Sequence, residues 1–178
     1  MHYLITGGCG YIGSHTAISL HEKGHSVTLF DNFSSSTQAS LEALQDLCND
    51  KLRFIHVDLK DIESIRNGFS QSERFDGVIH AASISHPNPS SNDIDSIYEN
   101  NVKGTQNLCD VMYEYRVFNM VFASSASVYG KPEKSPLNEL CRLDPQSPFG
   151  YAKRLAESEL VRRSLEHPEW RISSLRYF

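Results

Sequence analysis

Short apolar runs alternate along the chain with segments whose apolar positions repeat at helical spacing. The strand-like runs occupy residues 2–6, 26–30, 52–57, 75–83, 118–125 and 171–178. The helical segments span about 11–23, 93–115 and 149–165, with shorter helices around Leu41 and after Asp61. This alternation predicts an α/β fold, a doubly wound parallel sheet with right-handed crossovers and helices on both faces.

Apolar residues share one helix face in three of these segments. The predicted buried sets are Leu41, Leu44 and Leu47; Ile62, Ile65 and Phe69; and Ile94, Ile97, Tyr98, Val102, Thr105, Leu108 and Met112. A chain of 178 residues buries roughly two thirds of its unfolded surface, so we expect one domain over residues 1–178 with a single core.

Composition narrows the class of protein. Hydrophobic residues make up 39% and charged residues 22%, as in globular domains, and no apolar run is long enough to cross a bilayer. The formal net charge is −5 and the basic residues are scattered, so we expect no nucleic-acid partner and no membrane contact. The cysteines lack metal-type spacing and the N-terminus lacks a signal-peptide pattern. We therefore expect a reduced, cytoplasmic protein without a metal site.

Glycines cluster in "TGGCGYIGSH", between the first predicted strand and the first predicted helix. Gly7, Gly10 and Gly13 have GxxGxxG spacing, and Gly8, Gly10 and Gly13 also satisfy GxGxxG. In this context a tight turn brings backbone N–H groups and a positive helix end against a pyrophosphate. Either spacing alone also fits a turn that is needed only for packing.

Asp31 supplies a second signal for a dinucleotide. It ends the second strand and follows Gly10 by 21 residues, where a carboxylate can accept hydrogen bonds from the adenosine ribose. The same charge would repel the 2′-phosphate of NADP, and "FDNFSSSTQ" holds no lysine or arginine to bind that phosphate. We therefore predict NAD as the cofactor. An ordinary turn aspartate is the alternative interpretation of Asp31.

Seven motifs resemble a known family in order and spacing. They are "TGGCGYIGSH", "DN" at 31–32, "VDLKD" at 57–61, "NNVKGT" at 100–105, "SSASVYG" at 124–130, "PQSP" at 145–148 and "LRYF" at 175–178. Together they resemble the NAD-binding half of the UDP-glucose 4-epimerases, within the extended short-chain dehydrogenase/reductase group. The resemblance implies that the following residues contact or surround NAD: Gly7, Gly10, Tyr11, Ile12, Gly13, Asp31, Asn32, Phe33, Ser34, Ser35, Ser36, Asp58, Leu59, Ala81, Ala82, Ser83, Ser85, Asn100, Lys153 and Phe178.

The resemblance also implies a catalytic centre formed by Ser125, Lys153 and the residue at position 149. The family uses a tyrosine four residues before the lysine, and its phenolate takes the proton of a sugar hydroxyl as a hydride passes to NAD. This chain has Phe149 instead, in "SPFGYAKR". Residues four apart on a helix are offset by about 40° and residues two apart by about 200°. Phe149 therefore shares the face of Lys153, Tyr151 points away, and we expect poor turnover.

Three functions stay open at this point. The first is an NAD-dependent epimerase of UDP-glucose and UDP-galactose, with a homodimer left open. The second is a non-catalytic NAD-binding or sensing module, which Phe149 favours. The third is a nucleotide-sugar dehydratase or reductase, although "SSASVYG" lacks the acidic pair usual in dehydratases. A separate departure from the family pattern is Ser85, which stands where the family commonly has a lysine. Family members continue beyond the position of Phe178, so we expect the smaller substrate domain to be largely absent.

Overall fold

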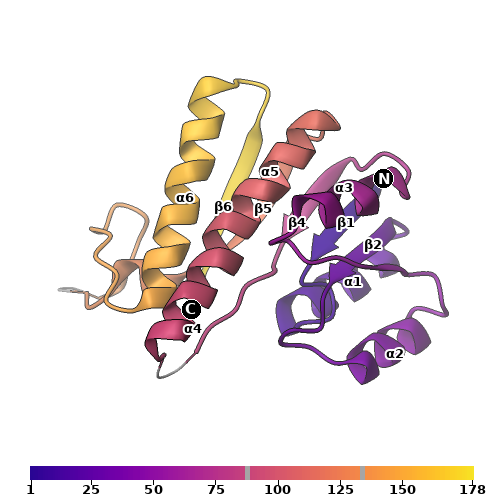
Figure 1. The fold of residues 1–178 in the computed structure, drawn as a ribbon, viewed down its shortest axis with the longest axis horizontal. Coiled ribbons are helices and arrows are strands. Elements are labelled where there is room, and N and C mark those ends of the chain that lie inside the picture. Colours follow the sequence, from indigo (N-terminus) through magenta and orange to yellow (C-terminus); the bar gives the residue numbers. More distant parts are fainter. Residues whose placement is uncertain (87–88, 133–134) are drawn as a thin grey trace.

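The structure is a computed structural model, and it describes residues 1–86, 89–132 and 135–178 (Figure 1). Its elements, in chain order, are β1 (His2–Thr6), α1 (Tyr11–Glu22), β2 (Ser26–Asp31), α2 (Gln38–Leu47), β3 (Arg53–His56), α3 (Ile62–Ser70), β4 (Gly77–His80), α4 (Ser91–Tyr98), the π-helical turn η1 (Glu99–Lys103), α5 (Gly104–Glu114), β5 (Asn119–Ser125), the 3₁₀ turn η2 (Ala126–Tyr129), α6 (Pro148–Glu166) and β6 (Arg171–Tyr177). No helix in these ranges combines the length and the apolar character needed to cross a membrane.

The strands form one parallel sheet in the order β3-β2-β1-β4-β5-β6, which confirms the predicted doubly wound fold. In the register of the sheet, Leu4 of β1 lies opposite Thr28 of β2 on one side and Val78 of β4 on the other. Successive strands add outward from β1 in one direction and then, from β4 onward, in the opposite direction. In open α/β sheets, ligands bind outside the carboxyl ends of the strands at such a switch point.

Two apolar layers enclose the sheet. Leu4 and Phe30 belong to the core shared with α3, α5 and α6, whereas Ile5 and Leu29 pack with α1 and α2 on the other face. Neighbouring strand residues point to opposite faces, so one apolar run supplies both cores. Figure 1 shows α5 and α6 lying together over β5 and β6. The carboxyl ends of the strands are thereby held at one edge of a rigid sheet.

The predicted helix at 93–115 is present, but a π-helical turn interrupts it. The helix begins at Ser91 as α4, passes through η1 and continues as α5. Ile94 and Tyr98, predicted to be buried, are 44% and 42% exposed, so this part of the prediction is wrong. All three predicted α4 positions precede the π turn, and Ile97 alone packs with Val102 of η1 and Ala152 of α6. Ile94 and Tyr98 lie about 60° and 100° around the helix from Ile97, outside this narrow buried stripe. The other predicted positions are buried: Ile97, Val102, Thr105, Leu108 and Met112.

Two other expectations need correction. Leu47 at the end of α2 is 67% exposed, although Leu41 and Leu44 are buried as predicted. Steps of three residues drift around a helix by about 60° each, which carries Leu47 about 120° from Leu41 and off the buried face. The fourth strand ends at His80 rather than at residue 83. Residues 81–83 leave the sheet at its carboxyl edge.

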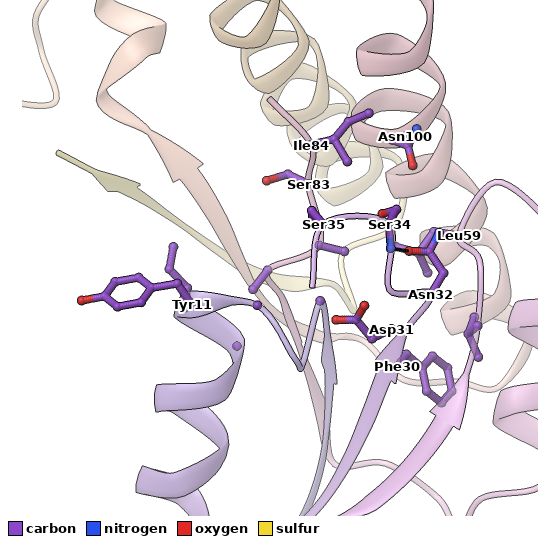
Figure 2. A pocket seen from close by; sticks show the side chains of 17 residues that line it. Tyr11, Phe30, Asp31, Asn32, Ser34, Ser35, Leu59, Ser83, Ile84 and Asn100 are labelled. Carbon is purple, nitrogen blue, oxygen red and sulfur yellow. Dashed lines mark hydrogen bonds between the residues drawn. The ribbon is translucent and has the colours of Figure 1, made fainter. Parts of the chain in front are cut away.

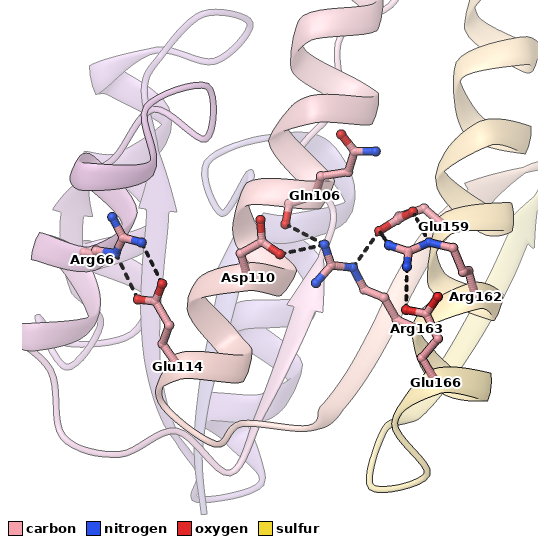
Figure 3. Close-up of polar contacts among 8 residues, drawn as sticks. All are labelled: Arg66, Gln106, Asp110, Glu114, Glu159, Arg162, Arg163 and Glu166. Carbon is pink, nitrogen blue, oxygen red and sulfur yellow. Dashed lines mark hydrogen bonds and ion pairs between the residues drawn. The ribbon is translucent and has the colours of Figure 1, made fainter.

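Ion pairs tie the helices of one face together (Figure 3). The Arg66 guanidinium of α3 donates to both carboxylate oxygens of Glu114 on α5, at 2.9 and 2.6 Å. Arg163 of α6 donates to Asp110 of α5 and to Glu159 one turn earlier, each at 2.7 Å. Each partly exposed ion pair of this kind contributes little to the free energy of unfolding. Their role is to fix how the three helices lie against one another.

Candidate functional site

A pocket of about 290 Å³ opens where β1, β2 and β4 end (Figure 2). Residues predicted from the sequence that line it are Gly7, Gly10, Tyr11, Ile12, Gly13, Asp31, Asn32, Ser34, Ser35, Leu59, Ala81, Ala82, Ser83 and Asn100. Ile84, within the stretch 81–85 expected to lie beneath the cofactor, also lines the pocket, whereas sequence reasoning missed Phe30 and Val57. Phe30 and Val57 lie at the ends of apolar strand runs at this edge of the sheet, and that position was the available signal.

The glycine turn packs too closely for side chains at two positions. Gly7 has a φ of +65°, and a Cβ there would lie 2.7 Å from the backbone of Ala82. A Cβ on Gly13 would lie 2.1 Å from the carbonyl oxygen of Gly7. The backbones of the turn, the first helix and the loop after β4 therefore lie in close contact. Any side chain at either position would force them apart.

The N-terminus of α1 faces this pocket without a capping side chain. Gly10 is its N-cap residue and makes no side-chain hydrogen bond, and the first turn contains no acidic residue. The first N–H groups of a helix have no partner within the helix and carry the positive end of its dipole. Together with the close glycine cradle, this arrangement fits a pyrophosphate group.

Asp31 is 8% exposed, lines the pocket and lies beside the glycine turn. Its Oδ1 accepts hydrogen bonds from Phe33 N at 2.9 Å and from Ser36 Oγ at 2.8 Å, and its Oδ2 accepts from Cys9 N at 2.9 Å. A carboxylate oxygen can accept about two hydrogen bonds, so Oδ2 keeps capacity for a ribose hydroxyl. The residues around Asp31 therefore fit the ribose of a dinucleotide.

Several predicted cofactor residues lie outside the pocket lining. Phe33 stacks on Phe54 with ring centroids 5.1 Å apart, and Ser36 orients Asp31. Three others lie elsewhere: Asp58 accepts a hydrogen bond from Lys60 N, Ser85 is exposed, and Phe178 is 92% exposed. Lys153 belongs to a separate cluster at the start of α6.

That cluster places Lys153 beside the phenylalanine ring. Lys153 is 3% exposed, its Nζ donates to the carbonyl oxygen of Ala123 at 2.7 Å, and the same atom lies 5.6 Å from the centroid of the Phe149 ring. Tyr151 is 55% exposed, which confirms that it points away from Lys153. Burial lowers the pKa of the Lys153 ammonium to about 7, against a raising effect from Glu157.

Ser125 ends β5 two residues after Ala123, so it lies at the same corner of the sheet as Lys153. Its Oγ accepts hydrogen bonds from Ser127 N at 3.1 Å and from Ser127 Oγ at 2.9 Å. These bonds fix the direction of the serine side chain. The corner thus holds a serine and a buried amine beside an aromatic ring that has no hydroxyl.

A parallel sheet with an uncapped helix, a close glycine turn and an aspartate at the switch point defines a dinucleotide-binding domain of Rossmann type. The sequence matches the family described as "NAD dependent epimerase/dehydratase family" over residues 3–178. The chain belongs to the NAD-dependent epimerase/dehydratase family, for which NAD is the cofactor.

Several similar proteins are named UDP-glucose 4-epimerase. The chain is 40% identical to a UDP-glucose 4-epimerase of Yersinia enterocolitica, covering 100% of this chain and 53% of that protein. It is 38% identical to one of Bacillus subtilis, covering 100% and 52%. A crystal structure of UDP-glucose 4-epimerase from Bifidobacterium longum in complex with NAD⁺ and UDP superposes with a TM-score of 0.94 at 32% identity, covering 100% and 53%. The chain spans about half the length of these relatives.

Proposed function

We propose that residues 1–178 form the NAD-binding domain of a UDP-glucose/UDP-galactose 4-epimerase-like enzyme whose proton-transfer centre is impaired. The observation that carries the proposal is the single pocket that joins the open N-terminus of α1 to Asp31. The corner holding Phe149, Lys153 and Ser125 supplies the second part of the argument.

The glycine turn and Asp31 divide the binding of NAD between them. The N–H groups at the start of α1 would hold the pyrophosphate, and Oδ2 of Asp31 would accept a hydrogen bond from the adenosine ribose. An additional phosphate on that ribose would meet a buried carboxylate. NADP would therefore bind more weakly than NAD.

Proton transfer is the step that this chain performs poorly. NAD, when bound, supplies the hydride acceptor for oxidation of a sugar carbon. The hydroxyl on that carbon must lose its proton to a positioned base, and Phe149 has no group that exchanges protons. Ser125 remains able to hydrogen-bond the sugar oxygen, and Lys153 remains able to stabilise a nearby negative charge.

Calorimetric titration with NAD and NADP tests the cofactor assignment, and conversion of UDP-galactose to UDP-glucose tests the reaction. We expect NAD to bind, NADP to bind much more weakly, and conversion to be close to background. Equal affinity for the two cofactors would contradict the role given to Asp31. Rapid conversion by this chain would contradict the role given to position 149.

A non-catalytic NAD-binding or sensing module is the second candidate, and Phe149 is the observation that favours it. It differs from the impaired enzyme in its response to restoration of the hydroxyl. Under the sensing function, Phe149→Tyr adds no turnover even when the chain is joined to the second half of a relative. Under the epimerase function it adds turnover there.

A further inference from the structure

A buried chain of hydrogen bonds lies behind the floor of the pocket. Thr6 Oγ1 is 2.7 Å from His80 Nδ1, and His80 Nε2 is 2.8 Å from Thr105 Oγ1. Thr105 Oγ1 in turn donates to the backbone carbonyl of Asn101 in the π-helical turn, at 2.7 Å. All four residues are 2% exposed or less. This hydrogen-bond network therefore runs from β1 through β4 to η1 and α5 without reaching solvent.

The protons in this chain can be placed from its chemistry. A carbonyl only accepts, so the single proton of the Thr105 hydroxyl points to Asn101, and Thr105 Oγ1 must accept from His80 Nε2–H. A neutral His80 then has a bare Nδ1, which accepts from the Thr6 hydroxyl. Full burial lowers the pKa of His80 to about 3, with a further lowering effect from Lys153. All three hydrogen bonds therefore donate in the same direction, from Thr6 toward Asn101.

Both ends of this chain reach the loop that lines the pocket. Ala82 N donates to Thr6 Oγ1 at 3.4 Å. The Asn101 side chain bonds Ile84 twice: its Oδ1 accepts from Ile84 N at 2.9 Å, and its Nδ2 donates to Ile84 O at 2.8 Å. Figure 2 shows Ile84 and Asn100, the residue before Asn101, on the same side of the pocket. The loop after β4 is thus tied to β1 at one point and to the helix at the other.

We propose that Thr6, His80, Thr105 and Asn101 are positioning residues that hold the pocket floor at Ala82–Ile84 in the geometry that NAD requires. This inference rests on the proposed function, because it takes the pocket to be the NAD site. A fully satisfied buried polar network rigidifies the groups that it joins. A floor that is already ordered binds its ligand without the entropy loss of ordering it.

Thr105→Val removes the central hydroxyl with little change in volume, and Thr105→Ser restores a hydroxyl. Thr28 provides a matched control: it is fully buried and its Oγ1 lies 2.8 Å from His2 Nε2, but it is not among the residues that line the pocket. Two quantities are measured on each variant. One is the Kd for NAD, and the other is the amide hydrogen exchange of Ala82 and Ile84 in protein without NAD.

Thr105→Val is expected to raise the Kd for NAD by about tenfold and to speed exchange at Ile84, because a buried polar group loses its partner. Thr105→Ser should restore most of the affinity, and Thr28→Val should leave both quantities near those of the parent chain. The same Kd and exchange in Thr105→Val and Thr28→Val would overturn the inference. If the parent chain binds no NAD, the proposed function fails instead, while the exchange data still test whether the network orders the loop. Asn101→Ala removes both bonds to Ile84 and serves as a second variant if Thr105→Val does not fold.

Discussion

Phe149→Tyr adds one oxygen atom to the corner that holds Lys153. The distance between Lys153 and this ring sets how far the amine lowers the pKa of the new phenol. With Lys153 Nζ 5.6 Å from the ring centroid, an ammonium and a phenolate at that distance attract by about 3 kcal/mol at an effective dielectric constant of about 20. That energy lowers the pKa of the new phenol from about 10 to about 8 while Lys153 carries its proton. The pKa of Lys153 is about 7, so at pH 8 only about a tenth of the amines carry a proton beside a neutral phenol, and the phenolate fraction stays well below one half.

The phenolate fraction can be measured as tyrosinate absorbance in the ultraviolet at pH 8, taken as the difference from the parent chain. We expect on the order of one molecule in ten to carry the phenolate, against about one in a hundred for a tyrosine with a pKa near 10. Adding Lys153→Met to Phe149→Tyr should return the fraction to the lower value. Equal fractions with and without Lys153 would refute the claim that this amine tunes position 149.

Turnover should respond to the same substitution only where the sugar is also held. A positioned base speeds a reaction by a factor of about 10² to 10⁴. Correct placement of the substrate lowers the activation barrier by about 7–11 kcal/mol, which is a larger effect. The relatives are about twice as long as this chain. We expect Phe149→Tyr to leave UDP-galactose conversion near background in the 178-residue chain, and to restore it strongly when the second half of a relative is attached. No restoration in the longer protein would contradict the epimerase function.

Three further predictions concern the core and the cofactor. Lys153→Met should stabilise the fold by a few kcal/mol below pH 7, where the parent protein must bury a charged amine. This gain should shrink as pH rises from about 7 to 10.5. Over that window Lys153 of the parent protein is neutral when folded and protonated when unfolded, so the stability of the parent protein rises with pH. Urea unfolding across this window checks it, with the exposed Lys23→Met as the control that should show no such gain. Asp31→Ala should weaken NAD and narrow its advantage over NADP in calorimetric titrations, since a buried charge next to the ribose is removed. Gly13→Ala should abolish NAD binding and cost about 1–3 kcal/mol or more in urea unfolding, because its Cβ would lie 2.1 Å from Gly7 O. Unchanged NAD affinity in this variant would show that the glycine turn is not the pyrophosphate site.

The order and types of the elements follow from local periodicity. A run such as residues 2–6 alternates its side chains between two faces wherever it lies in a sheet, which is why Leu4 and Ile5 enter different cores. Uniform periodicity fails where the backbone departs from it. No spacing rule announces the π-helical turn at Glu99–Lys103, nor does it show that α4 buries only the narrow stripe at Ile97 and leaves Ile94 and Tyr98 exposed.

Much of the pocket was predictable for a similar reason. The glycine turn comes directly after β1, and Asp31 is the last residue of β2. Because the carboxyl ends of parallel strands meet at one edge of the sheet, both were expected at the same site. The hydrogen bonds between Asn101 and Ile84 were not predictable, because the path of the loop after His80 depends on packing against residues distant in the sequence. Ser36 was predicted to surround the cofactor, but its hydrogen bond to Asp31 was not, because that bond depends on the path of the loop after β2.

The sequence by itself determined that Phe149 and Lys153 share a helix face, because four residues make nearly one turn. Only the tertiary structure decided that this face is buried against β5, where loss of water lowers the pKa of Lys153. Likewise, "HYLIT" contains Thr6 and "VIH" contains His80, but their hydrogen bond joins residues 74 positions apart. Local spacing fixes the direction of a side chain on its own element. The partner that it meets is set by the strand register and by the crossing of the helices over the sheet.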